Sequence, residues 1–457
     1  MLRTTLVLFI TLVGLSFCLY NPFYGLLLYT WYSFASPLDL TYGILADTKL
    51  SLVVAIFFIT ITYFSNKTIF RNNVLTYSVI LFLIIAFSSL AILGTYNIKT
   101  IFSNVEYLYK VAIISIIAPV VLKNAKNIKW YIVTIIGTVG ILAFYYGVFG
   151  LFSGSTYISG AGRIGDNNGY ALLLTSTIPL AVGLFLIFKE KILKLIILII
   201  IIGLLSALFL TFSRGGLIGF VVILILMIFN IKKRYLLGFL FIASLSLYTL
   251  TSFDLLKDLD EFSFKRDFRQ GSSPLDALDY YRVRIYTLLD NPSETESGSS
   301  RIHFWRVAIE MAMDNPILGV GINNYQSKYD EYDFLEGQYG TGRSVHNSFF
   351  IILAEMGYTG FLILIFIIVT IFYKLFLAKI KLHKLLFDNQ DEDLNNLRIL
   401  IPYIQISLIG FMVSGFFVIG IYQEIFWVFV TLAIAIDIVV SKKFNDNNSN
   451  EITSNIT

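Results

Sequence analysis

Long apolar runs separated by short polar connections dominate the sequence. Most of the runs are long enough to cross a hydrocarbon core of about 30 Å as a helix. The pattern therefore predicts an all-α polytopic membrane protein with about 12–13 transmembrane helices. The runs lie near residues 5–20, 22–36, 48–64, 74–94, 106–122, 131–152, 168–188, 195–212, 215–231, 235–252, 347–373, 399–419 and 421–440.

The first two runs leave the number of spans open. Simple alternation of the runs places the N-terminus outside, whereas Arg3 favours an N-terminus inside. If the run at 22–36 is re-entrant or interfacial, one span is lost and both ends of the chain are cytoplasmic.

The lysines and arginines of the connections predict the orientation, because cytoplasmic loops are enriched in these residues. With the basic connections inside, the third and later runs alternate without exception. The outer face then receives the segments 95–105, 153–167, 213–216 and 253–345. The basic connections contain Lys67 and Arg71; Lys123, Lys126 and Lys129; Lys189, Lys191 and Lys194; Lys232, Lys233 and Arg234; the lysines and arginine of 374–398; and Lys442-Lys443.

The outer segment 253–345, between the tenth and eleventh runs, is far longer than an ordinary connection. We expect it to fold as an extracytoplasmic cap. The chain then divides into N-terminal membrane helices (1–252), the cap, C-terminal membrane helices (346–441) and a tail (442–457). The tail is rich in Asn, Asp and Ser, a composition that predicts disorder.

Within the cap, five residues recur at the spacing of an amphipathic helix. The run Asp314-Asn315-Pro316 should end this helix, because the residue before a proline is pushed out of the α region. The apolar positions are Trp305, Ala308, Ile309, Ala312 and Met313.

Composition agrees with a membrane protein and excludes several functions. The chain is 57% hydrophobic and 14% charged, with a mean hydropathy of +0.77, whereas soluble domains carry about 25% charge. The net charge of +4 comes with dispersed lysines, which argues against a nucleic-acid partner. A single cysteine, Cys18, excludes an intrachain disulfide. No metal-ligand spacing or nucleotide-binding loop is present, so we expect neither metal nor cofactor.

Two arginines stand in short outer connections, where arginine should be scarce. Arg163 is one, and Arg214 lies in a tight turn followed by Gly215-Gly216. A charge at the edge of hydrocarbon is costly unless paired or solvated, and arginine binds phosphate through a planar bidentate fork. The pattern favours an anion site, although snorkelling to lipid headgroups would also explain Arg214.

The cap and its exit add further candidates. Arg301 falls in the first turn of the predicted cap helix, where a positive charge opposes the helix dipole and a bound anion would reverse the effect. Arg306 is explained as well by an i,i+4 ion pair with Glu310. His346 opens the next membrane helix, either as a cap of that helix or as a base that accepts a proton near neutral pH.

The remaining polar candidates have simpler explanations beside the functional ones. The run Asp166-Asn167-Asn168 could bind a sugar or cap the following helix. Lys110 could neutralise phosphate or extend to the membrane surface. Gly357 and Gly360 are spaced as a small face for close helix packing. His303 is expected on the surface of a loop.

Together these residues resemble the O-antigen ligase and O-antigen polymerase superfamily of bacterial envelope proteins. The family motif is His, then Asn, Ser or Gln, nine residues, Gly, two residues and Gly, which His346, Asn347, Gly357 and Gly360 match. Segments 300–305, 316–321, 213–215 and 166–168 also resemble family segments.

The N-terminal third resembles one branch, the exosortase-associated O-glycosylation ligases. The residues that carry this likeness are the segment 22–27, Trp31, Ser36-Pro37 and Tyr42-Gly43. The resemblance then covers about residues 1–375.

The resemblance implies a metal-independent, inverting glycosyltransferase at the outer face of the bacterial inner membrane. It would transfer a glycan from undecaprenyl diphosphate to a hydroxyl of a lipid, protein or glycan acceptor. By carry-over, His346 would be the general base, and Arg214 and Arg301 would hold the diphosphate. The residues expected to support substrate binding are Arg163, Asn167, Asn347, Lys110 and Arg306.

Two alternatives remain. A polymerase that joins lipid-linked repeat units would use the same residues and differ only in its acceptor. A flippase or other transporter would carry charges along a central cavity and internal two-fold symmetry. The apolar runs are almost free of charge and the outer arginines cluster at one rim, which favours catalysis at the membrane boundary.

Overall fold

The chain folds into helices, as the apolar runs predict. The computed structural model describes residues 2–40, 48–93, 98–149, 158, 160, 164–230, 296–388 and 391–454, and these ranges contain helices and no β-strand. The helices of the membrane layer are α1 (Leu2–Tyr20), α2 (Pro22–Ala35), α3 (Leu50–Asn66), α4 (Val74–Leu93), α5 (Ile98–Ile117), α6 (Ala125–Phe144), α8 (Asn167–Ile187), α9 (Lys191–Leu210), α10 (Arg214–Ile228), α15 (Ser348–Asp388), α16 (Glu392–Gly415) and α17 (Glu424–Ser454).

Seven helices of the described ranges are long and apolar enough to cross a membrane: α1, α6, α8, α9, α15, α16 and α17. Three shorter apolar helices, α3, α4 and α10, accompany them. A polytopic membrane protein is therefore confirmed. The predicted span at 235–252 and the first part of the cap, 253–295, lie outside the described residues.

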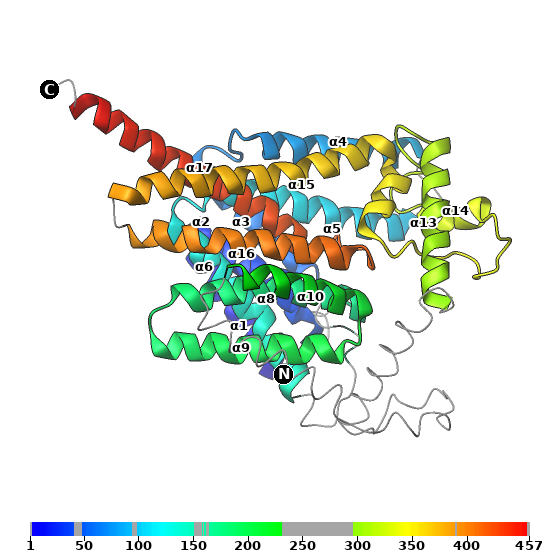
Figure 1. Cartoon of the computed structure of the whole chain (residues 1–457), viewed down its shortest axis with the longest axis horizontal. Coiled ribbons are helices and arrows are strands. Elements are labelled where there is room, and N and C mark those ends of the chain that lie inside the picture. Colours follow the sequence, from blue (N-terminus) through cyan, green and yellow to red (C-terminus); the bar gives the residue numbers. More distant parts are fainter. Residues whose placement is uncertain are drawn as a thin grey trace.

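The long helices lie side by side, with α8 and α17 inside the bundle (Figure 1). Of the apolar window of α8, 89% is buried by other helices, compared with 17% for α1. Helix α8 packs against α9, α10 and α16, whereas α15 packs against α4 and α17. An inner position suits α8, because its sequence is apolar around its whole circumference and carries no charge.

Helices α1 and α2 form an antiparallel hairpin that turns at Asn21. The Thr11 and Tyr32 hydroxyls share a hydrogen bond of 2.5 Å, and a Cβ on Gly14 would lie 2.8 Å from the Leu28 side chain. Helix α2 has 14 residues, which span only about 21 Å at 1.5 Å per residue. Because this is shorter than a hydrocarbon core, the structure agrees with the interpretation of 22–36 as a segment that does not cross fully.

Two of the predicted basic connections form ion pairs with the start of α16 at one end of the bundle. Lys129 pairs with Asp393 at 3.2 Å and Lys189 with Glu392 at 2.9 Å. Figure 1 shows the start of α16, which carries both carboxylates, at the end away from α13. The basic connections around Lys129 and Lys189 therefore share one end of the bundle with the start of α16.

Two predictions about where helices end are wrong. Helix α15 continues to Asp388 and covers much of the predicted connection 374–398. Helix α17 continues through the predicted disordered tail to Ser454 and extends beyond the bundle (Figure 1). Nucleation is the costly step in helix formation, so a helix whose first turns are packed can continue through polar residues.

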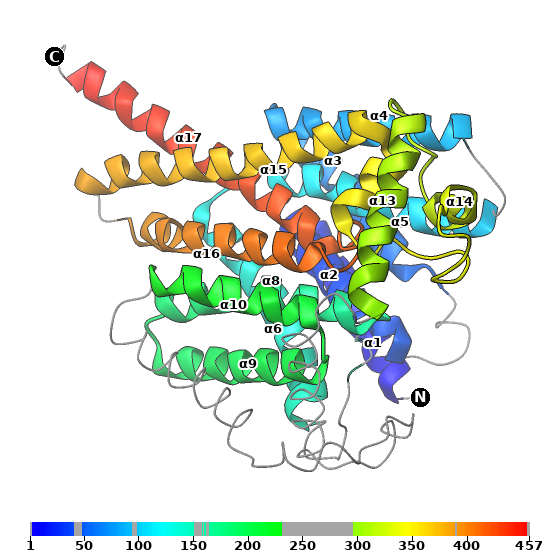
Figure 2. The ribbon, with the colours of Figure 1, turned by 45° about the vertical axis from the view of Figure 1, so that its right-hand side comes forward.

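The described part of the cap, 296–345, contains two helices, α13 (Glu296–Asp314) and α14 (Tyr325–Tyr332). Figure 2 shows α13 crossing the ends of the membrane helices. Its end at Asp314 is as predicted, but it begins at Glu296, so Arg301 lies in the second turn instead of the first. The buried face is also shifted from the predicted one: Val307 and Met311 are buried, while Met313 is 59% exposed.

The prediction of His303 as a surface residue is wrong. Its side chain is 4% exposed, and Nε2 lies 2.7 Å from Oδ1 of Asp333, which is equally buried. The rings of Phe334 and Tyr339 surround the imidazole. Burial alone would raise the pKa of the Asp333 carboxyl, but hydrogen bonds from the Leu335 and Gly337 amides and from His303 lower that pKa overall. His303 therefore holds α13 to Asp333, the residue that follows α14, within the cap.

Candidate active site

His346 lies at the entrance to α15, with its backbone in the left-handed region at φ +47°. A non-glycine residue rarely adopts this conformation, which costs about 1–2 kcal/mol. The next residue, Asn347, caps the helix: its Oδ1 accepts from the amides of Phe349 at 2.8 Å and Phe350 at 3.0 Å. Capping is therefore the role of Asn347, and the exposed His346 side chain does not perform it.

The short connection between α16 and α17, residues 416–423, holds this entrance in place. Asn347 Nδ2 donates to the Phe416 carbonyl at 3.1 Å. The Ser348 hydroxyl donates to the Val418 carbonyl at 2.8 Å and accepts from the Gly420 amide at 2.7 Å. The two residues that follow His346 are thus held by the connection 416–423, and this fixes the backbone from which the His346 side chain extends.

The turn before Arg214 is joined to the start of α8. Ser213 caps α10, since its Oγ accepts from the Gly216 amide at 3.2 Å, and it donates to Asn168 Oδ1 at 2.8 Å. Asn167 Nδ2 donates to the Thr211 carbonyl at 2.8 Å. The run 166–168 therefore acts mainly as a cap and a brace, as its simpler explanation predicted.

Phe417 links the two arginines named by the sequence. A Cβ on Gly215, next to Arg214, would lie 2.5 Å from the Phe417 Cβ, so only glycine allows this approach. On the other side, the Arg301 guanidinium carbon lies 5.7 Å from the centre of the Phe417 ring, within the range of a cation–π contact. Arg301 on α13 and the Arg214 turn therefore meet beside the connection that also holds Asn347.

The surroundings of His346 keep its imidazole neutral. Although the residue is exposed at the surface, the pKa of its imidazole is lowered from 6.5, first because the surrounding chain partly withdraws the ring from water, and then because of the positive charges of Arg301 and Arg343. The negative charge of Asp166 acts in the opposite direction. A neutral imidazole at pH 7 can accept a proton, as a general base must.

The charge balance around His346 predicts a measurable pH dependence. Because the imidazole loses activity when protonated, the acid limb of kcat/KM should lie below pH 6.5. Arg343→Gln removes a positive charge that disfavours the imidazolium, so the limb should move to higher pH. A pH–rate profile tests this, with Arg398→Gln on α16 as a distant control. A shift to lower pH in Arg343→Gln would contradict the assignment.

Gly357, the first glycine of the His346 motif, interrupts α15. Its φ of +65° and ψ of −168° are accessible only to glycine. The backbone groups of α15 that lack a helical partner because of this break pair with the turn 316–321. Val320 N donates to Ala354 O at 2.8 Å, and Tyr358 N donates to Pro316 O at 2.9 Å. The predicted role in close packing is therefore incomplete, because the partner is a cap turn and the glycine also breaks the helix.

Glu355, which sequence analysis overlooked, connects three parts of the site region. Its side chain is buried; Oε1 accepts from the Tyr325 amide at 3.2 Å, and Oε2 accepts from the Tyr422 hydroxyl at 2.9 Å. It thereby ties α15 to the start of α14 and to the connection 416–423. One signal was available, since a single carboxylate in a long apolar run is costly and usually has a defined partner.

The other predicted site residues are less central. Lys110 Nζ donates to Ser51 at 3.3 Å and lies over the Tyr107 ring, contacts that tie it to the α3–α5 pair. Arg306 is exposed, and the ion pairs of the described ranges do not include one with Glu310. Arg163 lies outside the described residues. In the same ranges, no three His, Cys, Asp or Glu side chains gather as a metal site would require.

Comparison with known families agrees with this geometry. Residues 197–365 match the model of a family described as O-antigen ligase, and this segment contains Arg214, Arg301 and the complete His346 motif. Over these residues the chain is similar to the O-antigen ligase family. Residues 1–188 match a second model, described as a family of unknown function (DUF5935). No curated protein matches the chain.

The O-antigen ligase segment supplies only part of the site. The start of α8, which braces the Arg214 turn, lies in the other matched segment, and the connection 416–423 lies beyond both. This match, together with the apolar helices, points to a multi-pass bacterial membrane protein and supports a role in glycan transfer or ligation.

Proposed function

We propose that this chain is a membrane glycosyltransferase that moves a glycan from undecaprenyl diphosphate to an acceptor hydroxyl. The observation that carries the proposal is the meeting of His346, Arg301 and the Arg214 turn around Phe416 and Phe417. One group that can take a proton and two cations that suit a diphosphate thus lie at the same end of the bundle.

In the proposed reaction, the neutral His346 imidazole takes the proton of the acceptor hydroxyl. The acceptor oxygen attacks the anomeric carbon, and the bond from this carbon to the diphosphate oxygen breaks with its electron pair. Arg214 and Arg301 stabilise the charge that builds on the leaving diphosphate. Attack opposite the leaving group inverts the anomeric configuration, as the family resemblance suggests.

The proposed location is the outer face of the bacterial inner membrane. The support is the distribution of basic residues: Lys129 and Lys189 lie at the end away from α13, and cytoplasmic ends are the basic ones. The His346 entrance and the cap then face outward. Arg163, Asn167, Asn347, Lys110 and Arg306 remain proposed contributors to substrate binding in this orientation.

The test is the release of undecaprenyl diphosphate from a lipid-linked glycan by the purified full-length protein, mixed with acceptor-containing membranes. Arg214→Ala should reduce release about 10²- to 10³-fold, the usual effect of removing one group that stabilises developing charge. Arg214→Lys should recover part of the activity, because the charge returns without the bidentate fork. Arg398→Ala, at the other end of α16, should behave as wild type.

The acceptor in this assay separates ligase from polymerase. Growth of the lipid-linked glycan without a membrane acceptor would indicate a polymerase, which the same residues would serve. Equal release by wild type and Arg214→Ala would exclude the proposed site. Movement of intact lipid-linked glycan across a vesicle membrane, without release of undecaprenyl diphosphate, would favour the transporter.

A further inference from the structure

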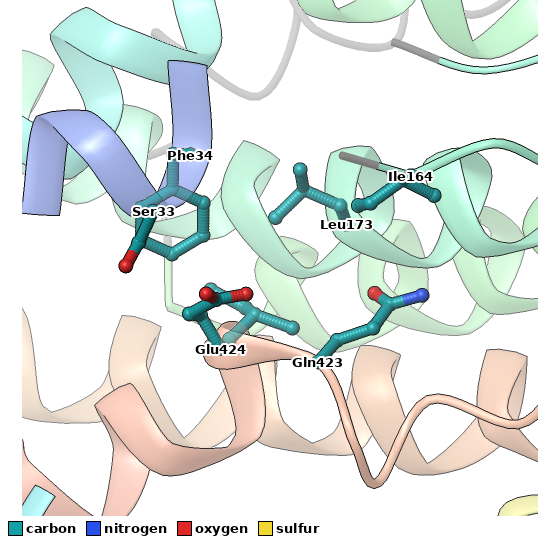
Figure 3. A pocket seen from close by; sticks show the side chains of 7 residues that line it. Ser33, Phe34, Ile164, Leu173, Gln423 and Glu424 are labelled. Carbon is teal, nitrogen blue, oxygen red and sulfur yellow. The ribbon is translucent and has the colours of Figure 1, made fainter. Parts of the chain in front are cut away.

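A small cavity lies between the C-terminal end of α2 and the start of α17 (Figure 3). The space is about the size of one water molecule or one hydroxyl group. Three polar side chains line it: Ser33 from α2, and Gln423 and Glu424 from the end of the α16–α17 connection. The apolar wall is formed by Phe34, Ile164, Leu173 and Ile425.

Within the part of the chain that the structure describes, the polar lining of this cavity is not fully satisfied. Ser33 is only 6% exposed, and its Oγ, the Gln423 Oε1 and the Glu424 Oε1 are buried without a hydrogen-bond partner among the described residues. Burying such atoms without a partner is unfavourable. Gln423 Oε1 can only accept, so its missing partner must be a hydrogen-bond donor.

The cavity adjoins the His346 entrance through the cap of α8. A Cβ on Gly169 would lie 2.6 Å from Asp166 Oδ2 and 2.7 Å from Gln423 Nε2, so both side chains pack against this glycine. Asp166 is the carboxylate whose charge acts on His346. Gln423 therefore stands between the cavity and the residues that surround the proposed base.

We infer that this cavity is a subsite that binds one hydroxyl of a substrate beside the His346 entrance, through Ser33, Gln423 and Glu424. This inference rests on the proposed glycan transfer. A hydroxyl donates to the Glu424 carboxylate and can accept from Ser33, while the apolar wall contacts the carbon that bears it. The size of the space excludes a whole sugar ring and selects a single hydroxyl or hydroxymethyl group.

Two isosteric or small substitutions test the subsite. Glu424→Gln keeps the shape but replaces the carboxyl group by an amide, and Ser33→Ala removes one hydroxyl. The affinity of full-length protein in nanodiscs is measured for lipid-linked glycan extracted from bacterial membranes and for undecaprenyl diphosphate without glycan. Glu424→Gln should weaken binding of the lipid-linked glycan by up to about tenfold, the effect of losing one hydrogen bond, and leave the affinity for undecaprenyl diphosphate unchanged.

A kinetic arm identifies which substrate supplies the hydroxyl. If the KM for acceptor membranes rises in Glu424→Gln while the affinity for lipid-linked glycan is unchanged, the hydroxyl belongs to the acceptor. If the affinity for lipid-linked glycan falls, the hydroxyl belongs to the donor. Glu392→Gln removes a carboxylate that is largely exposed at the other end of the bundle, so both quantities should equal those of wild type.

Thermal unfolding distinguishes a subsite from a structural contact. A structural Glu424 would lower the unfolding midpoint when replaced, whereas a subsite carboxyl leaves it unchanged, because glutamine keeps its shape and an acceptor oxygen. Unchanged affinity and unchanged KM would overturn the inference and leave a cavity that holds water only. An equal loss of affinity for undecaprenyl diphosphate would also overturn it.

The binding arm also separates this inference from the proposed function. If wild type binds lipid-linked glycan but releases no undecaprenyl diphosphate, the proposed transfer fails while the binding comparison still decides the subsite. If wild type releases undecaprenyl diphosphate and Glu424→Gln matches it in every quantity, the transfer stands and the subsite fails.

Discussion

Alanine in place of Gly357 should destabilise the protein by at least about 3 kcal/mol and abolish its activity. The backbone there adopts a conformation that only glycine tolerates, which alone costs other residues about 1–3 kcal/mol. In addition, the new Cβ would lie 2.6 Å from the Pro316 carbonyl oxygen. Separating α15 from the 316–321 turn would leave the Ala354 carbonyl without its partner. The measurement is the thermal unfolding midpoint of purified protein, together with the yield of monodisperse material.

The control for this variant is Gly137→Ala in α6. No atom lies within 4 Å of a Cβ built on Gly137, and the residue is inside a regular helix. Alanine should therefore raise stability there by about 0.5–1 kcal/mol. If Gly357→Ala unfolds at the wild-type temperature, the helix break is not a requirement of the fold.

Glycine in place of His346 should reduce release of undecaprenyl diphosphate about 10²- to 10⁴-fold without loss of stability. The rate falls because the proposed general base is removed. Stability should be equal or higher by up to about 1 kcal/mol, since glycine adopts φ +47° without strain. The assay is turnover beside thermal unfolding for the same preparation.

His346→Asn provides the comparison, because asparagine tolerates the left-handed region but cannot take a proton at neutral pH. It should be as inactive as the glycine variant. Binding of lipid-linked glycan should remain close to wild type in both. A variant that retains a tenth of the wild-type turnover would show that His346 is not the base.

Much of the bundle follows from the sequence because hydropathy alone specifies a membrane helix. Twelve of the predicted apolar runs correspond to described helices, from α1 to α17. The exceptions are helix ends that residue types alone do not set. Helix α17 runs past the membrane into polar sequence, and Glu296 begins α13 although the amphipathic pattern starts later. Neither the end of α17 nor the start of α13 is marked by residue types that indicate a helix boundary.

The site could be predicted only where one residue has an unusual cost. Arg214 and His346 stand out because charge and imidazole are rare at a membrane boundary. Phe417 could not be found this way, since one more phenylalanine in an apolar sequence has no distinguishing property. Its importance comes from Gly215 and Arg301 on either side, contacts between segments far apart in the chain. His303 was misjudged for the same reason, because its partner Asp333 lies 30 residues away.

Gly357 illustrates a different limit. The motif spacing locates it, and its small size is correctly taken as a packing feature, but a backbone break in the middle of an apolar run has no hydropathy signature. The turn that compensates, 316–321, precedes it in the chain, and the sequence predicts there only the end of the cap helix. Hydrogen bonds exchanged between two backbone segments cannot be read from side-chain types.

The brace between α8 and the Arg214 turn has a consequence for building hybrid proteins. The boundary between the two matched segments, 188 to 197, is a natural crossover point for exchanging halves between relatives. Yet the bonds from Asn167 to Thr211 and from Ser213 to Asn168 cross it, so a hybrid inherits one partner of each pair from each parent. Functional hybrids will be those whose parents agree at the three side chains involved, Asn167, Asn168 and Ser213, since Thr211 contributes only its backbone carbonyl. A crossover after Arg214 transfers both pairs together.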